Sequence, residues 1–410
     1  MIDKNRSYWV IISNKVYYTN KNGRALLYNT ENGQYIITSN KMHISVLEDM
    51  HRKQALGVVK LGEQELLNND IYNFLCDAVN KDIFKYVDTE QYPTRPIQLM
   101  PILSLHKEVE KLTKRDGRLL GLNAGKQLLS AVLYLNNECV LQCEYCGVYN
   151  RQFLHCGKTE NGGEMDFDLL KSILNQLRST QIQTLHITGA NIFKYGKFER
   201  LANLLKEYRF NVNIYFHLSN YNIKSVSLLK DFKHNIFIHF PLSPLDNDVL
   251  KNIAVDNIIF HFVITSDNDY AQSQQIIEQY NLSNTVFHPF FTGENIIFFE
   301  ENTFLSENDI LESEVKQKTI FANQKLNSNF YGTLHFCSDG NVFSNPNAEP
   351  LENIKNMPLL DLIYKEMIEN TSWRKIRNEK PCSDCNYQYL CPPVSNYETA
   401  IGRPNLCTVF

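Results

Sequence analysis

Apolar and polar residues alternate with two different periods along the middle of this chain. Stretches such as 167–178, 197–208 and 270–280 place apolar residues three and four positions apart, which predicts helices. Between and around them lie six short apolar runs that predict buried strands, at 130–135, 182–187, 212–218, 235–241, 258–264 and 285–291. Repeated strand–helix units predict an α/β fold with a parallel sheet or partial barrel, whose chemistry lies at the carboxyl ends of the strands.

The chain before residue 90 has a different pattern. Short alternating runs predict three strands, at Tyr8–Ile12, Lys15–Tyr18 and Ala25–Tyr28. From His43 to about Val87 the apolar spacing becomes helical. Residues 1–88 are therefore expected to form a small α+β domain, a strand meander followed by helices. The proline-containing start of residues 89–128 predicts a linker.

The strand–helix rhythm of residues 129–300 ends beyond Glu300. In the last segment, residues 301–410, Asp339-Gly340 is a turn signal that predicts a hairpin between two short strands, Gly332–Phe336 and Asn341–Phe343. One helix is expected near 358–369, and the last cysteines lie in loop-rich sequence. This segment is therefore expected to form a third domain.

Composition limits the partners and the compartment. The 410 residues are 43% hydrophobic and 21% charged with a net charge of -4, so neither nucleic acid nor an anionic membrane is expected as a partner. No apolar run approaches the roughly 20 residues of a membrane span, and the first residues lack a signal-peptide pattern, so a cytoplasmic protein is expected. In that reducing compartment the ten cysteines indicate metal ligands rather than disulfides.

The first cysteine cluster follows the first strand of the strand–helix series. Cys139, Cys143 and Cys146 can each bind one iron of a [4Fe–4S] cluster and leave the fourth iron open to the amino and carboxylate groups of S-adenosylmethionine. A zinc loop is the alternative, for which His155 or Cys156 is the local candidate fourth ligand. Apart from that alternative, Cys156 and Cys76 are interpreted as ordinary thiols.

This spacing, with an aromatic residue just before the third cysteine, resembles the signature of the radical S-adenosylmethionine superfamily. The resemblance implies a partial (β/α)6 TIM-like barrel and an enzyme that forms a 5′-deoxyadenosyl radical. The family's Gly-Gly-Glu turn corresponds here to Gly189-Ala190-Asn191, so the glutamate is missing. The resemblance places cofactor contacts at Tyr145, Gly189, Ala190, Asn191, Ser219, Asn220, Ser243 and Asp246.

The second cluster has enough thiols to close a metal site. Its spacing suits structural zinc and a fully ligated iron–sulfur cluster equally, with candidate ligands Cys382, Cys385, Cys391 and Cys407. Together with the preceding hairpin, this run resembles a SPASM- or twitch-type domain. The positions expected to hold two cysteines of a first auxiliary cluster are Asn345 and Ser395, which makes Cys337 a leftover thiol. The resemblance therefore implies one auxiliary [4Fe–4S] cluster, and two clusters in the whole chain.

Two further resemblances suggest a substrate. The C-terminal segment from Cys391 to Cys407 resembles peptide maturases of the Bacteroidetes-type, grasp-with-spasm-like group, and residues 1–88 are similar to a PqqD-like peptide-recognition domain. They imply a ribosomal precursor peptide with a leader as substrate and an electron donor such as a flavodoxin or ferredoxin. The reaction would be a crosslink or an epimerisation. The rival hypotheses are a catalytically weakened scaffold that assists a separate maturase, and a zinc-ribbon protein.

Overall fold

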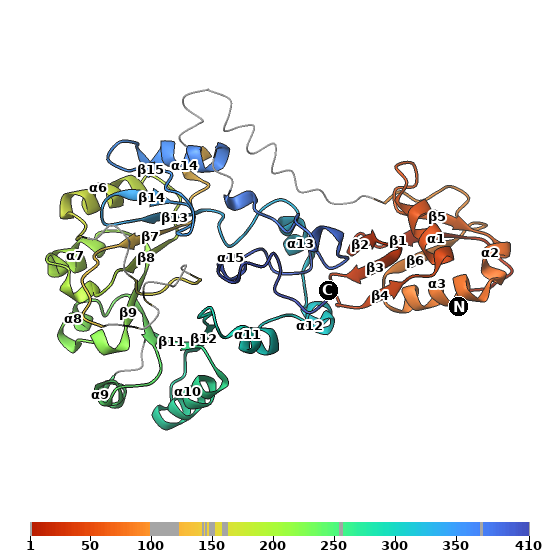
Figure 1. Ribbon diagram of the computed structural model, residues 1–410. Coiled ribbons are helices and arrows are strands. Elements are labelled where there is room, and N and C mark those ends of the chain that lie inside the picture. Colours follow the sequence, from red (N-terminus) through yellow and green to blue (C-terminus); the bar gives the residue numbers. More distant parts are fainter. Residues whose placement is uncertain are drawn as a thin grey trace.

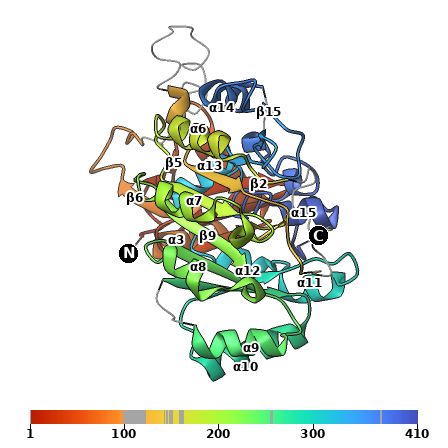
Figure 2. The same ribbon diagram turned by 90° about the vertical axis from the view of Figure 1, so that its left-hand side faces the viewer.

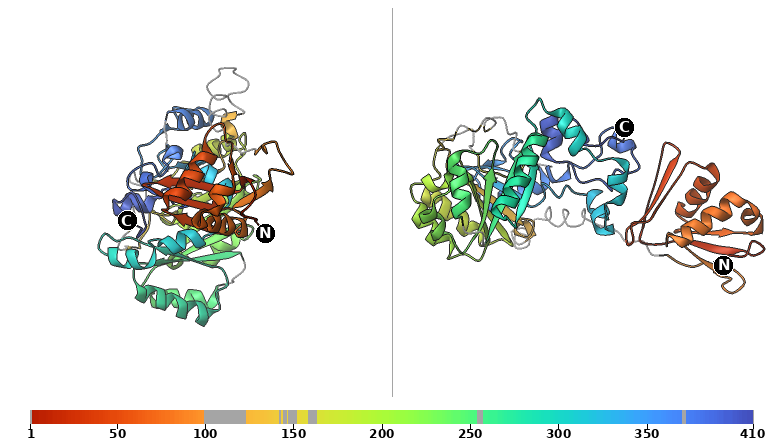
Figure 3. Two further views of the ribbon diagram at one scale, coloured as in Figure 1. Left: turned by 90° about the vertical axis from the view of Figure 1, so that its right-hand side faces the viewer. Right: turned by 90° about the horizontal axis from the view of Figure 1, so that it is seen from below.

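The computed structural model describes residues 2–98, 123–141, 143, 146, 152–157, 163–253, 257–369 and 372–409. In Figure 1 the N-terminal segment, in red and orange, lies at one end, the large sheet at the other, and part of the C-terminal segment between them. Figure 3 shows the same order from below. Among the helices of these residues, none has both the length and the apolar character needed to cross a membrane.

A nine-stranded sheet forms the larger end, in the order β12-β11-β10-β9-β8-β7-β13-β14-β15. Its first six strands are parallel to their neighbours. They are β7 (Ser130–Tyr134), β8 (Thr184–Thr188), β9 (Asn211–His217), β10 (Lys233–Ile238), β11 (Ile258–Ile264) and β12 (Thr285–Pro289). All six strand predictions are therefore confirmed, and the six carboxyl ends meet at one edge of the sheet.

Helices connect these strands and cover one face of the sheet, as Figure 2 shows for α6, α7 and α8. They are α6 (Phe167–Leu177), α7 (Phe198–Leu205), α8 (Ile223–Leu228), α9 (Pro244–Asn252) and α10 (Asp267–Tyr280). The two-residue period of each strand decides which side chains meet them. In β7, Ala131 and Leu133 enter the main core, whereas Val132 and Tyr134 face the opposite side.

The predicted C-terminal segment continues the same sheet. Strand β13 (Thr333–Phe336) pairs in parallel with β7 and antiparallel with β14 (Asn341–Phe343), which confirms the hairpin, and β15 (Glu352–Asn353) follows. Helix α14 (Leu359–Ile368) packs its apolar residues into the main core, close to the predicted 358–369. The remaining helices are α11 (Ile296–Asn302), α12 (Glu307–Glu312), α13 (Gln317–Asn323) and α15 (Asn396–Ile401).

The N-terminal segment contains two three-stranded sheets, β2-β3-β4 and β5-β1-β6. Its strands are β1 (Tyr8–Ile12), β2 (Val16–Lys21), β3 (Arg24–Asn29), β4 (Tyr35–Thr38), β5 (Val58–Leu61) and β6 (Phe84–Asp88). Its helices are α1 (Lys41–His51), α2 (Glu63–Leu67) and α3 (Asn69–Asn80). The predicted meander is therefore wrong in one member, because β1 lies in the other sheet and β4 completes the meander.

The N-terminal segment packs against the second cysteine segment. Leu26 and Tyr28 of β3 share an apolar cluster with Ile310 of α12 and Tyr387. The Tyr28 hydroxyl donates to the Ser313 carbonyl at 2.9 Å. A shared buried core of this kind couples the stability of the two segments, since each covers apolar surface of the other.

Candidate metal centres

The structure brings the three cysteines of the first motif around one small cavity. The cavity lies at the carboxyl ends of the parallel strands, where the fold places chemistry. A fourth thiol, Cys156, and two histidines share it. Its lining consists of Cys139, Leu141, Cys143, Cys146, Cys156, Gly157, Ala190, His217 and His239.

Backbone contacts after β7 and β8 shape this cavity. A Cβ atom on Gly189 would lie 2.8 Å from Asn136 Oδ1 and 3.1 Å from Asn136 N, so only glycine allows this approach. The Ala190 N–H donates to the Asn136 carbonyl at 3.0 Å, and the Gly157 N–H donates to the Gly189 carbonyl at 3.1 Å. The loop that carries Cys156 is therefore held against the turn that follows β8.

We expect Gly189→Ala to destabilise the chain by about 1–3 kcal/mol, the usual cost of forcing an extra carbon into a packed site. The methyl group would push Asn136 away and break the hydrogen bond that aligns Ala190 with it. Urea unfolding followed by circular dichroism measures the loss. Gly163→Ala is the control, because no atom of the described residues lies within 4 Å of a Cβ there and only the backbone is strained. Equal losses would contradict the role of this close approach.

Cys156 was interpreted as an ordinary thiol, but the structure places it beside the first motif. Burial raises the pKa of the Cys156 thiol, and the neighbouring thiols of Cys143, Cys146 and Cys139 raise it further. Four thiols around one cavity can fill every ligand position of a metal site, whereas three thiols leave one position open. Cys156, one of the two candidate fourth ligands of the zinc-loop alternative, therefore lies beside the other three thiols.

Two histidines at this cavity were missed by the sequence analysis. Ligand atoms of Cys143, His217 and His239 all lie within 4.8 Å of one another. Burial lowers the pKa of His217 to about 4 and lowers the pKa of His239 well below its usual value. Both rings are therefore neutral at pH 7. The two-residue period of β9 and β10 could have predicted which face of the sheet they occupy. His217 and His239 lie two residues after Tyr215 and Phe237, which share that face.

The predicted cofactor contacts have partners of their own. The Asn191 Oδ1 accepts the Phe193 N–H at 3.1 Å, and its Nδ2 donates to Asn220 Oδ1 at 3.0 Å. The Asn220 Nδ2 in turn approaches Cys139 Sγ at 4.0 Å. Asn191 and Asn220 therefore form a chain that ends at a motif cysteine. Tyr145 lies outside the described residues.

Ser219, Ser243 and Asp246 form a second network. Ser243 caps α9 and exchanges hydrogen bonds with Asp246, whose other oxygen accepts the Ser219 hydroxyl at 2.6 Å. Asp246 is buried, and it lowers the cost of its own burial by accepting these bonds. Of the predicted cofactor contacts, Ala190 lines the cysteine cavity. The contacts of all these residues with a cofactor, Ala190 included, remain predictions.

The face of the sheet opposite the helices is rich in histidine. Among the described residues, five histidines project from its strands, at 186, 217, 261, 288 and 335, and His239 lies just after β10 with its ring 4.9 Å from that of His217. His261 Nε2 lies 3.0 Å from Asn235 Oδ1, and its Nδ1 lies 2.8 Å from His288 Nε2. Burial lowers the pKa of His261 to about 3 and that of His288 to about 4, so these two rings are uncharged at pH 7.

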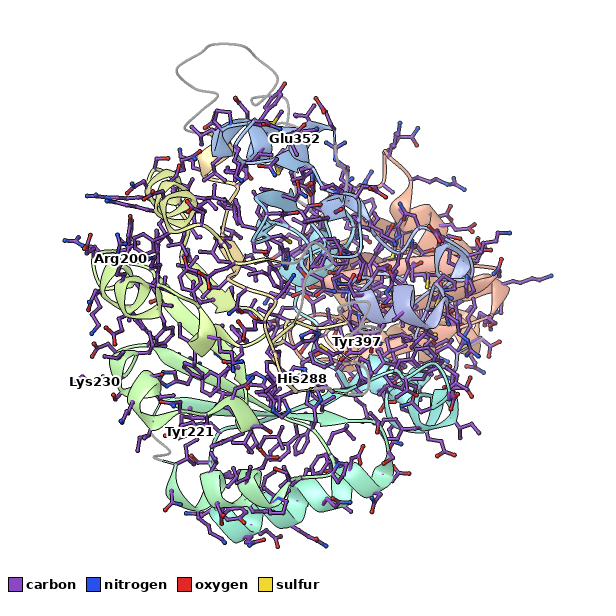
Figure 4. All side chains as sticks on the ribbon, turned by 60° about the vertical axis from the view of Figure 1, so that its left-hand side comes forward. Arg200, Tyr221, Lys230, His288, Glu352 and Tyr397 are labelled. Atoms are coloured by element: carbon purple, nitrogen blue, oxygen red, sulfur yellow. The ribbon has the colours of Figure 1, made fainter. Side chains whose placement is uncertain are left out.

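A larger cavity of about 390 Å³ lies on this face, beside the C-terminal segment. In Figure 4 His288 and Tyr397 lie in the interior, whereas Arg200 and Lys230 lie at the periphery. The centroid of the Phe153 ring lies 4.5 Å from that of His288 and 6.4 Å from that of Tyr397. Within the described part of the chain, the cavity lining contains no Asp, Glu, Lys or Arg. This cavity therefore suits an uncharged guest.

The second cysteine motif also closes around one small cavity. Its lining includes all four predicted ligands, Cys382, Cys385, Cys391 and Cys407. Burial raises the pKa of Cys385 to about 11 and that of Cys391 to about 12. Thiolates are therefore costly here without a cation, and a bound metal would offset that cost.

Basic and amide groups surround the second set of thiols. The Arg377 guanidinium lies 3.9 Å from Cys382 Sγ and donates to Glu398 at 2.6 Å, and the Asn405 Nδ2 lies 3.3 Å from Cys407 Sγ. At the positions where the resemblance expected further cysteines, Asn345 bonds Asn396 and Ser395 caps α15. The observed donor set is four thiols, which fits a fully ligated cluster or zinc.

No protein-family model matches the chain, and no curated protein matches it. Among solved structures, SuiB of Streptococcus suis bound to precursor peptide SuiA is 14% identical over 97% of this chain and 98% of that chain, with a TM-score of 0.42. The anSMEcpe protein with bound AdoMet and Cp18Cys peptide is 13% identical over 67% of this chain and 95% of that chain, with a TM-score of 0.45. These identities and TM-scores are too low to assign a function to this chain.

Proposed function

We propose that this protein is a radical S-adenosylmethionine enzyme that modifies a ribosomally made precursor peptide. The observation that carries the proposal is the convergence of Cys139, Cys143 and Cys146 on one cavity at the carboxyl ends of the parallel strands. A [4Fe–4S] centre held there with one open iron would supply the electron that cleaves S-adenosylmethionine to a 5′-deoxyadenosyl radical. The Bacteroidetes-type subgroup, and the choice between crosslink and epimerisation, remain predictions.

Each part of the chain has a role in this proposal. The cavity that contains Ala190 and His217 holds the cofactor, and the adjoining uncharged cavity beside Tyr397 receives the peptide segment that is modified. The four C-terminal thiols hold an auxiliary cluster. That cluster would pass electrons from a flavodoxin- or ferredoxin-type donor.

Anaerobic reconstitution with iron and sulfide tests the proposal. We expect iron without stoichiometric zinc, and 5′-deoxyadenosine after addition of S-adenosylmethionine and dithionite. Iron-loaded protein that releases no 5′-deoxyadenosine would contradict it. Such a result would favour the scaffold hypothesis, which Cys156 supports because a fourth thiol could close the first site. Stoichiometric zinc would favour the zinc-binding alternative.

The N-terminal meander offers a strand edge for the leader peptide. Its β2 side faces the C-terminal segment, where Lys21 Nζ donates to the Ser383 carbonyl at 3.0 Å. The opposite edge is β4. The Asn29 N–H donates to the Gln34 carbonyl at 2.8 Å, so the alternation of an antiparallel pair turns the backbone groups of Tyr35 and Ile37 away from β3. We propose that the leader adds to this edge as a further strand.

We expect Ile37→Pro to weaken leader binding about tenfold, because proline removes one outward donor and its ring obstructs the added strand. Ile37→Ala keeps the N–H and is the matched control. Calorimetric titration with a synthetic leader peptide measures both. Equal affinities for the two variants would show that the leader does not use β4.

A further inference from the structure

Two nitrogen-bearing side chains, one at the end of β9 and one in the turn that follows it, lie close to two of the three motif cysteines. The Asn220 Nδ2 lies 4.0 Å from Cys139 Sγ. A ligand atom of the His217 ring lies within 4.8 Å of the Cys143 thiol. Both groups belong to the chain itself, so the fold alone places them beside the cysteines.

The orientation of Asn220 is fixed by a backbone donor. The Phe193 N–H can only donate, so the atom of Asn191 that accepts it at 3.1 Å is Oδ1 and the other is the amide nitrogen. That nitrogen donates to Asn220 Oδ1 at 3.0 Å, which leaves the Asn220 nitrogen facing Cys139. The turn that lacks the family's glutamate therefore has a hydrogen-bonding task of its own.

The tautomer of His217 is fixed in the same way. The Ser219 N–H donates to His217 Nδ1 at 3.1 Å, so Nδ1 carries a lone pair and Nε2 carries the proton. The side chain is 7% exposed and lines the cysteine cavity, and its Nε2 has no hydrogen-bond partner among the described residues. A neutral ring protonated on Nε2 cannot use that nitrogen to bind a metal. It can donate to a sulfur that does.

We propose that Asn220 and His217 donate hydrogen bonds to the metal-bound sulfurs of Cys139 and Cys143, that Asn191 positions Asn220, and that these bonds raise the reduction potential of the first centre. The proposal rests on the iron–sulfur function proposed above. Reduction adds negative charge to the irons and their sulfur ligands, so an N–H donor stabilises the reduced form more than the oxidised form. Asn191 is then a positioning residue rather than a contact of the methionine amine.

Potentiometric titration of the anaerobically reconstituted full chain, followed by electron paramagnetic resonance, tests this. The signal of the first centre is identified by its loss in Cys143→Ala. We expect Asn220→Ala, Asn191→Ala and His217→Asn each to lower its midpoint potential. In His217→Asn the amide oxygen can still accept the Ser219 N–H, so the local turn is kept while the reach toward Cys143 is lost.

His234→Asn is the matched control. His234 is also buried with an unpartnered Nε2 among the described residues, but it lies near the amino end of β10, at the opposite edge of the sheet from the cysteines. In His234→Asn the midpoint potential of the first centre is expected to equal that in the unchanged chain. Full iron content with unchanged potentials in all three test variants would overturn the proposal while leaving the enzyme function intact. Absence of iron from the unchanged chain would instead refute the proposed function.

Loss of the cluster in the variants would not end the test. Electron–nuclear double resonance on the unchanged chain, in H₂O and in D₂O, detects exchangeable protons coupled to the first centre. We expect such protons, and their absence would overturn the proposal. If Asn191→Ala weakens S-adenosylmethionine binding without changing the potential, Asn191 contacts the cofactor and the positioning role is wrong.

Discussion

Cys143→Ala is expected to halve the iron content of the reconstituted protein, from about eight to about four irons per chain, and to abolish formation of 5′-deoxyadenosine. The physical reason is that two thiols of an open three-thiol site do not retain a cube, whereas the four-thiol cavity around Cys391 is separate from it. Iron analysis and chromatographic detection of 5′-deoxyadenosine measure the two effects.

Controls for this prediction come from the other cysteines. Cys76→Ala changes a thiol of α3 that packs in the N-terminal core, and both its iron content and its product formation should match the unchanged chain. Cys156→Ala separates the open from the closed site, because loss of a fourth ligand would lower iron retention whereas loss of a bystander would not. About twelve irons per chain, or one zinc per motif, would refute the assignment of three plus four thiols.

The sequence predicted the central fold well because strand and helix periods are local properties. All six strands between β7 and β12 follow from short apolar runs, and Asp339-Gly340 marked the hairpin. The N-terminal segment was predicted less well. Val58–Leu61 and Phe84–Asp88 lie within apolar spacing that also fits a helix, and their strand pairing with β1 is set by tertiary contacts.

The cysteine sites were predictable to a different degree. Spacing alone identified the seven motif thiols, because clustered cysteines of this kind are rare without a metal. Spacing offered Cys156 only as one of two candidate fourth ligands, with His155; its place beside the motif follows from the hydrogen bond between Gly157 and Gly189. The sequence could not predict His217 and Asn220 as hydrogen-bond donors, since the orientations of their side chains depend on hydrogen bonds with Ser219 and Asn191.

Arg377→Gln is expected to destabilise the C-terminal segment by about 3–5 kcal/mol, because it leaves a buried carboxylate without its cation. The Arg377 and Glu398 side chains are 9% and 3% exposed, and their closest atoms are 2.6 Å apart. Glu398 also accepts the Ser395 N–H that begins α15, and Arg377 approaches Cys382. The ion pair therefore joins the helix end to the second cysteine cavity, and its loss should also lower iron retention there.

Arg403→Gln is the matched control for that change. Arg403 pairs with Glu300 at 2.8 Å, but the two side chains are 47% and 42% exposed, so water replaces the lost partner and the cost should not exceed about 1 kcal/mol. Urea unfolding of both variants, followed by the combined fluorescence of Trp9 and Trp373 and by iron release, measures the difference. Similar losses in the two variants would show that burial does not strengthen the Arg377–Glu398 pair. A large loss confined to Arg377→Gln, accompanied by release of about half of the iron, would tie this ion pair to the second centre.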